Sequence, residues 1–376
     1  MSDSLHVGVD ALNLLHDRRG IWRYANALLR RFMRMDSERL RVTLLVPHAL
    51  PRLVARPLAR ALDCDDVVVR RRRDAAGLGL HIVWYPWNGM TWVSPCRNVA
   101  TVHDVWPFAS PAEDLRKRRS EQTPFRTTAA HTKVIITDSQ FSKTEIVKYL
   151  AVSPQHIRVV ALGVDPVPAD SGQPLLLDGA SRYVLFVGES EPRKDLTTLQ
   201  DAMMKLPDAL RMTTGFVIAG APRATSSTRG RVDYQRYEGK QSTVLRFELV
   251  DGVPTLVTGT VGDELLHELY GGAAAFVFPS RYEGFGLPVL EAMAHGAPVL
   301  ASNAASIPEV AGDAALYFPA GNAGALAHEL TQILSDRILD ARLRTAGQSR
   351  AATFTWDRCA EETLGIFEAV ASSEKV

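Results

Sequence analysis

Two acidic and two basic side chains in the second half of the chain are of types that could handle a charged, hydroxyl-rich ligand. Glu283 and Glu291 lie on either side of a glycine-containing turn in FPSRYEGFGLPVLEAMAHGAPV, and Arg193 and Lys194 lie in GESEPRKDLTTLQDAM. Carboxylates accept hydrogen bonds from hydroxyl groups, and fixed cations stabilise negative charge that develops on a leaving phosphate. This combination is typical of a site for a sugar nucleotide.

The segment around the two glutamates predicts a strand, a loop and a helix, in that order. The apolar run 274–278 is typical of a strand buried on both faces of a parallel sheet. In the following loop, Gly284 and Gly286 allow close backbone approach, and Pro288 suits the first turn of a helix that would also hold Glu291. Such a helix directs unpaired N–H groups and the positive end of its dipole toward a phosphate.

Each of these charged residues also has an ordinary structural explanation. Glu283 could be a loop charge, and Glu291 could simply complement a helix dipole. Arg193 and Lys194 could be a solvated pair at a helix start. Two cations at a helix N-terminus oppose the dipole, however, and an anionic ligand would remove that conflict.

Polar residues in the first half follow apolar runs in the same manner. His103 and Asp104 come after an expected strand in TVHDVWPF, and Ser139 comes after the next one. Ligands of open α/β sheets bind at the carboxyl ends of strands, which favours a site here, although Ser139 could equally cap a helix. Gly20, in RRGIWRYANALL, would let the backbone approach a phosphate or an acceptor, or would simply open a helix.

Length and composition predict a globular protein with two domains. The chain has 376 residues, 46% of them hydrophobic and 23% charged, with a formal net charge of +1. Domains usually hold about 100 to 200 residues, and a near-neutral charge gives no general attraction to nucleic acid. We therefore expect two cores and no nucleic-acid partner.

Cysteine usage and hydropathy predict a cytoplasmic location. Cys64, Cys96 and Cys359 lie far apart, which favours neither a disulfide framework nor a zinc site. The first residues lack a basic start followed by a long apolar region, and no run of about 18 apolar residues occurs. We expect no cofactor and no metal.

Strand-like and helical patterns alternate along the chain, which predicts an α/β fold with parallel sheets covered by helices. The expected strands are 6–10, 41–46, 81–85, 98–103, 133–137, 183–187, 216–219, 255–258, 274–278, 298–301 and 314–318. Ser142 and Glu145 have capping-box spacing and predict the start of a helix. The irregular stretch 221–254 is interpreted as a helix of uncertain limits plus loop.

Composition changes place the domain boundaries. The proline- and glycine-rich segment 166–181 is the expected linker. It separates an N-terminal domain, 1–165, from a second domain, 182–352. Helical spacing predicts a final helix within 353–376.

The spacing of Glu283 and Glu291, the sequence GFGLPVLEAMAHGAPV around them and the downstream PEVAGDAA resemble the donor site of retaining GT-B glycosyltransferases, specifically glycosyltransferase family 4. The resemblance implies two Rossmann-like, doubly wound domains facing a central cleft, with the last helix crossing back to the first domain. It also implies that the first domain is the acceptor side and that the second binds the nucleotide-sugar donor. Many family members carry arginine directly after the strand glycine, where this chain has Glu189. Arg193 must then supply that cation.

The resemblance also implies roles for individual residues. Glu283 would contact hydroxyls of the transferred sugar, Glu291 the ribose, and Arg193 with Lys194 the pyrophosphate. His103 would orient the donor sugar through its ring or its backbone carbonyl. The implied catalytic residues are Glu283, His103, Arg193 and Lys194; the donor-binding residues are Gly188, Arg193, Lys194, Ser280, Glu283, Gly284, Phe285, Gly286, Leu287 and Glu291; Gly20, Asp104 and Ser139 would form an acceptor or phosphate loop.

The motif HD-x-x-PF, together with PRKD, is similar to bacterial mannosyl and deoxyhexosyl transferases that build O-antigen or exopolysaccharide. This resemblance implies retaining, metal-independent transfer of mannose or rhamnose from a GDP-sugar to a glycan or lipid-linked acceptor. A UDP-sugar donor is the nearest alternative. The arginine runs Arg70–Arg73 and Arg116–Arg119 are either solvated faces or a peripheral contact with an anionic membrane.

Three other protein classes remain as alternatives. A nucleotide-sugar epimerase shares the GT-B architecture but needs no acceptor. A dinucleotide-dependent oxidoreductase should carry G-x-G-x-x-G after its first strand, and VGVDALNLLHDRRG does not. A binding protein without catalysis would not need Glu283, Glu291, Arg193 and Lys194 together.

Overall fold

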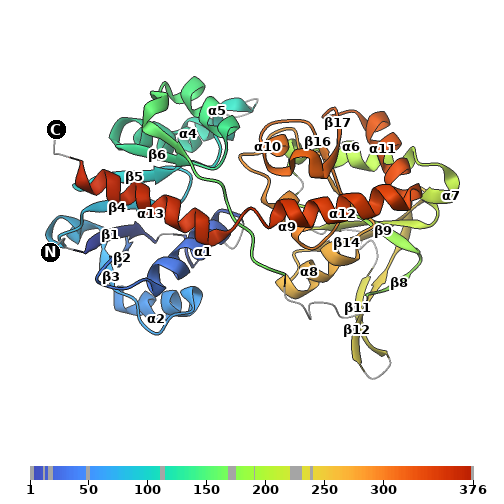
Figure 1. The fold of residues 1–376 in the computed structure, drawn as a ribbon, viewed down its shortest axis with the longest axis horizontal. Coiled ribbons are helices and arrows are strands. Elements are labelled where there is room, and N and C mark those ends of the chain that lie inside the picture. Colours follow the sequence, from blue (N-terminus) through green and yellow to red (C-terminus); the bar gives the residue numbers. More distant parts are fainter. Residues whose placement is uncertain are drawn as a thin grey trace. The chain divides into compact units, whose positions relative to one another are not determined.

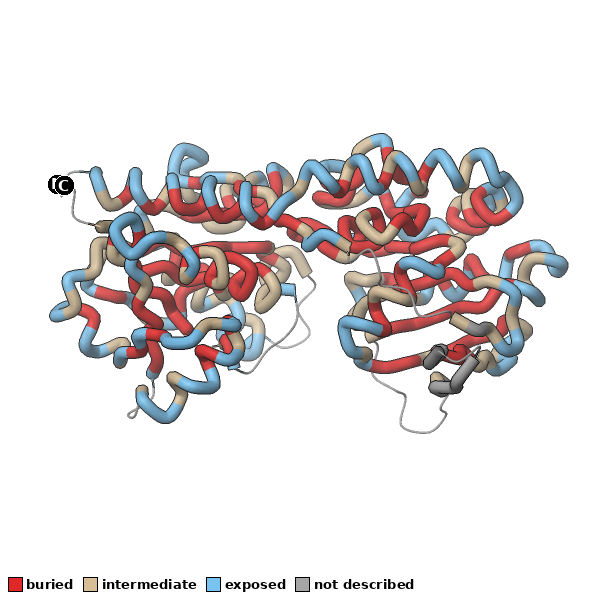
Figure 2. Tube along the Cα trace, turned by 60° about the horizontal axis from the view of Figure 1, so that its bottom comes forward, coloured by how far each residue is buried: buried red, intermediate tan, exposed pale blue. Residues whose placement is uncertain are grey.

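The structure is a computed structural model that describes residues 4–11, 13–15, 20–47, 51–110, 115–167, 175–189, 191–220, 231–237 and 240–373. The chain divides into two compact units. The first unit comprises Met1–Gly163 and Phe354–Val376, and the second comprises Val164–Thr353. Each unit has its own parallel sheet with buried strands between more exposed helices (Figures 1 and 2).

The first unit contains a seven-stranded parallel sheet in the order β3-β2-β1-β4-β5-β6-β7. Its strands are β1 (Leu5–Asp10), β2 (Leu40–Val46), β3 (Val69–Arg71), β4 (Ile82–Tyr85), β5 (Arg97–Thr101), β6 (Val134–Thr137) and β7 (Ile157–Val159). The chain builds outward from β1 in one direction and then from β4 in the other. The carboxyl ends of these two central strands therefore form a topological switch point, where open α/β sheets bind ligands.

Helices cover the sheet of the first unit. They are α1 (Gly20–Arg34), α2 (Pro51–Leu62), α3 (Trp106–Ala109), α4 (Leu115–His131), α5 (Gln140–Leu150) and α13 (Trp356–Ser372), with 3₁₀ turns η1 (Arg72–Gly77) and η2 (Pro154–His156). The last helix, α13, packs on α1, β4 and β5 (Figure 1). Its Phe367 ring lies 5.5 Å from the Trp84 ring and 5.9 Å from the Phe32 ring. The expected return of the final helix to the first domain is confirmed.

The chain leaves and re-enters the first unit at adjacent points. A Cβ atom on Gly163 would lie 2.2 Å from the backbone nitrogen of Trp356, the first residue of α13. No side chain larger than hydrogen fits there without moving backbone atoms, since real Cβ atoms do not approach so closely. Glycine at 163 thus allows the two connecting segments to lie side by side.

The second unit repeats the architecture with the order β13-β14-β10-β9-β15-β16-β17. Its strands are β9 (Arg182–Val187), β10 (Thr214–Ala219), β13 (Glu248–Val250), β14 (Val253–Gly259), β15 (Ala275–Phe278), β16 (Val299–Ser302) and β17 (Ala315–Phe318). All neighbours are parallel except β13 and β14. The switch point here lies between β9 and β15. The expected α/β fold with two doubly wound parallel sheets is confirmed.

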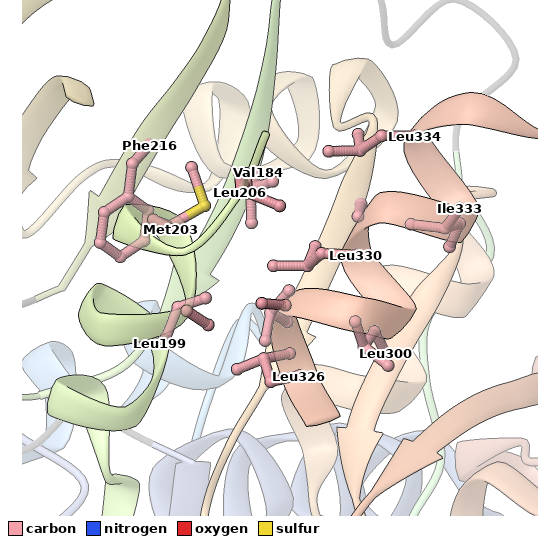
Figure 3. Packing of buried hydrophobic residues seen from close by; sticks show 14 of the residues in the cluster. Val184, Leu199, Met203, Leu206, Phe216, Leu300, Leu326, Leu330, Ile333 and Leu334 are labelled. Atoms are coloured by element: carbon pink, nitrogen blue, oxygen red, sulfur yellow. The ribbon is translucent and has the colours of Figure 1, made fainter. Parts of the chain in front are cut away.

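The core of the second unit is formed where helices pack on this sheet. The helices are α6 (Leu196–Met204), α7 (Asp208–Arg211), α8 (Asp263–Gly272), α9 (Leu287–Ala294), α10 (Ile307–Ala311), α11 (Ala323–Ser335) and α12 (Arg337–Ala351), with 3₁₀ turns η3 (Pro192–Lys194) and η4 (Gly312–Ala314). Figure 3 shows Leu199 of α6, Leu330 of α11 and strand residue Val184 in one cluster of buried hydrophobic side chains. Each such leucine contributes about 1.5–3 kcal/mol on burial.

A small second sheet in this unit corrects two expectations. Strands β11 (Arg231–Tyr237) and β12 (Lys240–Arg246) form an antiparallel hairpin, and β8 (Leu175–Asp178) runs parallel to β12. The described part of 221–254 is therefore strand where a helix was expected, and the expected linker 166–181 contains β8. The β-branched and apolar residues Thr243, Val244 and Leu245 are buried in this sheet, which explains the strand. Residues 168–174, 221–230 and 238–239 lie outside the described residues.

One expected helix start and the expected place of Glu291 are also corrected. Ser139, not Ser142, caps α5, because its hydroxyl accepts the N–H of Ser142 at 3.0 Å. The Ser142 hydroxyl instead donates to the His103 carbonyl at 2.8 Å. In the second unit, Glu291 is the fifth residue of α9 rather than part of its first turn, since the helix begins at Leu287.

Candidate active site

The charged residues predicted in the second unit meet at the switch point between β9 and β15. Lys194 follows β9, and Glu283 follows β15. The Lys194 Nζ atom lies 2.6 Å from Glu283 Oε1, and the Arg193 Nη1 atom lies 3.6 Å from Glu283 Oε2. The two loops come together because their strands are adjacent and parallel, so both carboxyl ends lie at the same edge.

The loop after β9 holds its two cations in a short 3₁₀ turn rather than at a helix N-terminus. This turn, η3, ends at Lys194, and Asp195 follows with a φ of 49° before α6 begins. The Arg193 carbonyl accepts the N–H of Arg281 at 2.7 Å. Arg281 Nε in turn lies 2.7 Å from Asp195 Oδ2. These contacts tie the two loops together and fix where the cations lie.

Carboxylates balance both cations. Arg193 Nε lies 2.6 Å from Glu191 Oε2, in addition to its contact with Glu283. Burial raises the pKa of the Glu191 carboxyl, but the hydrogen bond and the charge of Arg193 outweigh burial and leave this pKa lowered. The side chains of Lys194 and Glu283 are 12% and 9% exposed, and Lys194 Nζ also lies 5.1 Å from the centre of the Phe278 ring. The site is a partly shielded, ordered set of charges.

Two serines that the sequence analysis did not single out hold the glutamate loop. The Ser306 hydroxyl lies 2.9 Å from the carbonyl oxygens of both Glu283 and Phe285. The Ser302 hydroxyl, at the end of β16, donates to the Ser280 carbonyl. Neither serine belongs to a recognisable motif, and their roles follow only from β16 lying beside β15.

Some of the other predicted donor-binding residues are glycines that would act through their backbone, and the rest have buried side chains. Gly286 precedes α9 with a φ of 103°, which a side chain would strain, while Phe285 and Leu287 beside it are buried. Gly188 directly follows β9, and its N–H donates to Ala219. Gly284 lies in the same loop as Glu283. Ser280 is fully buried, so its contact with the donor stays a prediction.

Glu291 lies in α9, and its carboxylate accepts a hydrogen bond from the Tyr270 hydroxyl at 3.0 Å. Its backbone carbonyl lies 2.8 Å from His295 Nδ1. The side chain is buried among these groups, and the residue is 9% exposed. Glu291 therefore has a buried, hydrogen-bonded carboxylate and is not simply a charge near the helix start.

In the first unit, His103 is enclosed by protein partners. Its Nδ1 atom lies 2.6 Å from Asp138 Oδ2, and its Nε2 atom lies 3.2 Å from the Pro86 carbonyl. Burial lowers the pKa of the imidazole, but the charge and hydrogen bond of Asp138 raise it, and the net pKa is raised. Both ring nitrogens face acceptors, which corrects the expectation that the ring, as placed, bonds a sugar hydroxyl. The backbone-carbonyl role stays a prediction.

The remaining first-unit residues have local structural roles. Asn88 Oδ1 accepts the N–H groups of His103 and Asp104, at 2.8 and 3.3 Å. Asp104 Oδ1 accepts the N–H of Trp106 at the start of α3. Ser139 caps α5, as its structural alternative predicted. Gly20 is the exposed first residue of α1, so both interpretations of it stay predictions.

Among the residues that the structure describes, no three His, Cys, Asp or Glu side chains gather as metal ligands would. Metal independence stays a prediction. Over the same residues, no helix combines the length and apolar character needed to cross a membrane.

Known proteins resemble this chain in sequence. A family model described as "Glycosyl transferases group 1" matches residues 170–350, which include both loops of the charged site. O-antigen chain mannosyltransferase B of Escherichia coli is 31% identical over 284 residues, covering 72% of this chain and 70% of that protein. This chain belongs to the group 1 glycosyl transferases.

Other similarities of this group 1 glycosyltransferase extend the comparison. MMP alpha-(1->4)-mannosyltransferase of Mycolicibacterium hassiacum is 29% identical over 266 residues, covering 68% of this chain and 56% of that protein's length. The structure of WaaG, a glycosyltransferase involved in lipopolysaccharide biosynthesis, aligns with a TM-score of 0.64 and 15% identity over 96% of this chain and 99% of that one. HepE of Anabaena, solved with UDP and glucose, aligns with a TM-score of 0.65 and 14% identity over 98% and 100%. The GT-B fold and the glycosyltransferase class expected from the sequence are confirmed.

Proposed function

We propose that this glycosyltransferase transfers mannose, or a deoxyhexose such as rhamnose, from a GDP-sugar to a glycan or lipid-linked glycan acceptor in cell-surface polysaccharide synthesis. The observation that carries the proposal is the contact of Lys194 and Arg193 with Glu283 at the switch point of the second sheet. The mannosyltransferase names of the two sequence relatives support the choice of sugar.

The charged set suits the departure of a nucleoside diphosphate. Negative charge grows on the pyrophosphate as the glycosidic bond breaks, so Arg193 and Lys194 stabilise the transition state more than the ground state. Arg193 presents a planar fork of donors, which can hold Glu283 and a phosphate oxygen together. Glu283, fixed by Lys194 at 2.6 Å, accepts hydrogen bonds from hydroxyls of the transferred sugar. Glu291 accepts them from the ribose.

The proposed reaction retains the anomeric configuration, as in glycosyltransferase family 4, and needs no metal. The bond from the anomeric carbon to the phosphate oxygen breaks, and a bond to the acceptor oxygen forms on the same face of the sugar. The acceptor proton passes to the leaving phosphate. The paired cations take the electrostatic role that a divalent ion has in other transferases.

The first test is thermal stabilisation by GDP, UDP, ADP and NAD, because a ligand at 100 times its dissociation constant adds about 2.7 kcal/mol. We expect selective stabilisation by GDP, followed by turnover of GDP-mannose or GDP-rhamnose with lipid-linked acceptors and a product of unchanged anomeric configuration by NMR. Stabilisation only by NAD would reject the transferase.

A UDP-sugar donor is the second candidate. It is supported by the HepE structure, which was solved with UDP and glucose and shares the fold. Selective stabilisation by UDP in the same experiment would establish it. The enzyme class would then stand, while the mannosyl and rhamnosyl donors would be rejected.

We also propose a cytoplasmic enzyme that binds weakly to anionic membranes through the start of α4. Leu115 there is 68% exposed, and the basic run Arg116–Arg119 follows it. Each cation near such a surface contributes about 1 kcal/mol. The run Arg70–Arg73 is less suitable, because Arg72 forms an ion pair with buried Asp10 at 2.6 Å.

Flotation with phosphatidylserine vesicles tests this contact. We expect the double variant Lys117→Gln/Arg119→Gln to lose vesicle binding, and Arg337→Gln/Arg342→Gln, a change of equal charge on α12, to keep it. No flotation of the unaltered enzyme at low salt would contradict the membrane proposal and leave the transferase proposal untouched.

A further inference from the structure

The hydroxyl of Tyr270 is directed at the carboxylate of Glu291 by a firmly packed ring. Tyr270 belongs to α8 and is 1% exposed. Its ring stacks on His295 at 5.5 Å with planes 30° apart and meets the Phe276 ring edge-on, also at 5.5 Å. The hydroxyl lies 3.0 Å from Glu291 Oε2. Because the ring cannot shift easily, it delivers a hydrogen-bond donor to a fixed point.

The same cluster holds Glu291 at its backbone. His295 Nδ1 lies 2.8 Å from the Glu291 carbonyl, so the residue that stacks on Tyr270 also contacts α9 near its end. A carboxylate only accepts hydrogen bonds, and its two oxygens offer about four lone-pair positions. A tyrosine donor on Oε2 therefore fixes the plane of the carboxylate while leaving it the capacity to accept further hydrogen bonds.

We propose that Tyr270 is a positioning residue for the nucleotide, whose hydroxyl orients the Glu291 carboxylate to accept both hydroxyls of the ribose diol. The inference rests on the proposed function, in which Glu291 binds the ribose. Preorganisation of this kind lowers the cost of fixing the carboxylate when the ligand binds. Tyr270 touches Glu291 and not the reacting atoms.

The position of the ribose predicts a specific kinetic effect. The ribose does not change chemically during sugar transfer, so its contacts are the same in the ground state and the transition state. Loss of such a contact raises KM for the donor and leaves kcat unchanged. A role in maintaining the fold alone would not separate the two constants in this manner.

The test compares Tyr270→Phe with Tyr183→Phe. The control removes another buried tyrosine hydroxyl that bonds to α8, since Tyr183 donates to the Leu269 carbonyl at 2.8 Å. The probes are GDP and UDP, each alongside its 2′,3′-dideoxyribose counterpart, with dissociation constants measured by calorimetry. We expect Tyr270→Phe to weaken the preferred ribonucleotide about tenfold, because the lost bond is made to a charged group. The dideoxy form should be unaffected, and Tyr183→Phe should change neither.

The same comparison in a variant of Glu291 provides a further test. In Glu291→Ala, which removes the acceptor, the effect of Tyr270→Phe on ribonucleotide affinity should disappear, since the two residues act through one contact. Equal weakening of ribose and dideoxy forms, equal weakening by Tyr183→Phe, or no weakening would overturn the role of Tyr270 alone. If the unaltered enzyme did not distinguish ribose from dideoxyribose, the proposed Glu291 contact would fail as well. If it bound neither diphosphate, the proposed function itself would fail.

Discussion

The two sheets of this enzyme both have a switch point between central parallel strands but use the charged residues at their carboxyl edges differently. In the second unit, Lys194 and Arg193 contact Glu283 across two loops, with side chains 12%, 19% and 9% exposed. In the first unit, the side chains of His103 and Asp138 are 8% and 2% exposed and bond to each other. Topology thus indicates where a ligand site can form, and the partners of the charged groups differ: two cations meet at Glu283, whereas both ring nitrogens of His103 face acceptors.

The comparison predicts different consequences of removing a charge. Breaking a buried pair leaves an uncompensated charge inside the protein and costs about 3–5 kcal/mol of stability, whereas exposed pairs contribute about 0–1 kcal/mol. Changes to the His103–Asp138 pair of the first unit should therefore lower stability. At the charged site of the second unit, removal of Glu283 should lower catalysis, and removal of a cation should lower nucleotide affinity. The following variants test this separation.

Glu283→Ala should have the largest effect, on catalysis. We expect turnover to fall about 10²- to 10³-fold, as when one preorganised polar group is removed from a transition-state site. Nucleotide affinity should stay unchanged, because Arg193 and Lys194 remain. Initial rates and calorimetry measure the two quantities, with Glu362→Gln as the control for a surface ion pair, that of Glu362 with Arg358 at 2.7 Å. Parallel loss of binding and turnover would contradict this role.

Asp138→Asn should lower the free energy of unfolding by about 3 kcal/mol, because it leaves the His103 imidazole without its carboxylate in the interior. Urea denaturation measures the change. The matched control is Asp357→Asn, which removes an exposed partner of Arg31 and should cost about 1 kcal/mol or less. Equal effects of Asp138→Asn and Asp357→Asn would show that burial of the His103–Asp138 pair does not increase its contribution to stability.

Lys194→Met should weaken GDP binding about tenfold or more through loss of a charge-assisted hydrogen bond, and should leave guanosine binding unchanged. Calorimetry with the two ligands separates contact with the pyrophosphate from contact with the nucleoside. Equal weakening of both would place Lys194 outside the phosphate site. If the enzyme prefers uracil nucleotides, UDP and uridine are the matched pair.

The smallest expected effect is a pH dependence of the free energy of unfolding, caused by His103 in the first unit. Folding raises the pKa of His103, so its contribution is fully present below the unfolded value of about 6.5 and is lost as pH rises through the folded value. The free energy of unfolding should therefore fall more between pH 6.5 and pH 9 in the unaltered enzyme than in His103→Gln. Identical slopes in the two proteins would show that the imidazole does not titrate with folding.

Local sequence patterns predicted most strands of both sheets and the loops that carry the charges. The apolar run before Pro279 and the glycines around Glu283 are sufficient to predict strand β15, its loop and α9. The hairpin of β11 and β12 was missed because its polar residues show neither period clearly. Its strands are specified by pairing with each other and with β8, which lies more than 60 residues earlier in the chain than β12.

Residue types also predicted the candidate site in part. Glu283, Arg193 and Lys194 were all named, and the structure brings them together. His103 was named too, but its neighbours Asp138 and Pro86 occupy both ring nitrogens, which depends on three strands ending at one place. Tyr270 gave no signal, because an aromatic residue in an amphipathic helix is usually a core residue.

Periodicity, turn residues and residue chemistry are properties of short segments, and they were enough to specify the fold class and the charged residues of this enzyme. Contacts such as that of Lys194 with Glu283, separated by 89 positions, were decided only by the tertiary structure. The same holds for the enclosure of His103 and for the Tyr270 hydroxyl on Glu291. The reason is that strand order and helix packing arise from burying many distant apolar side chains together, so no single segment encodes which polar groups become neighbours.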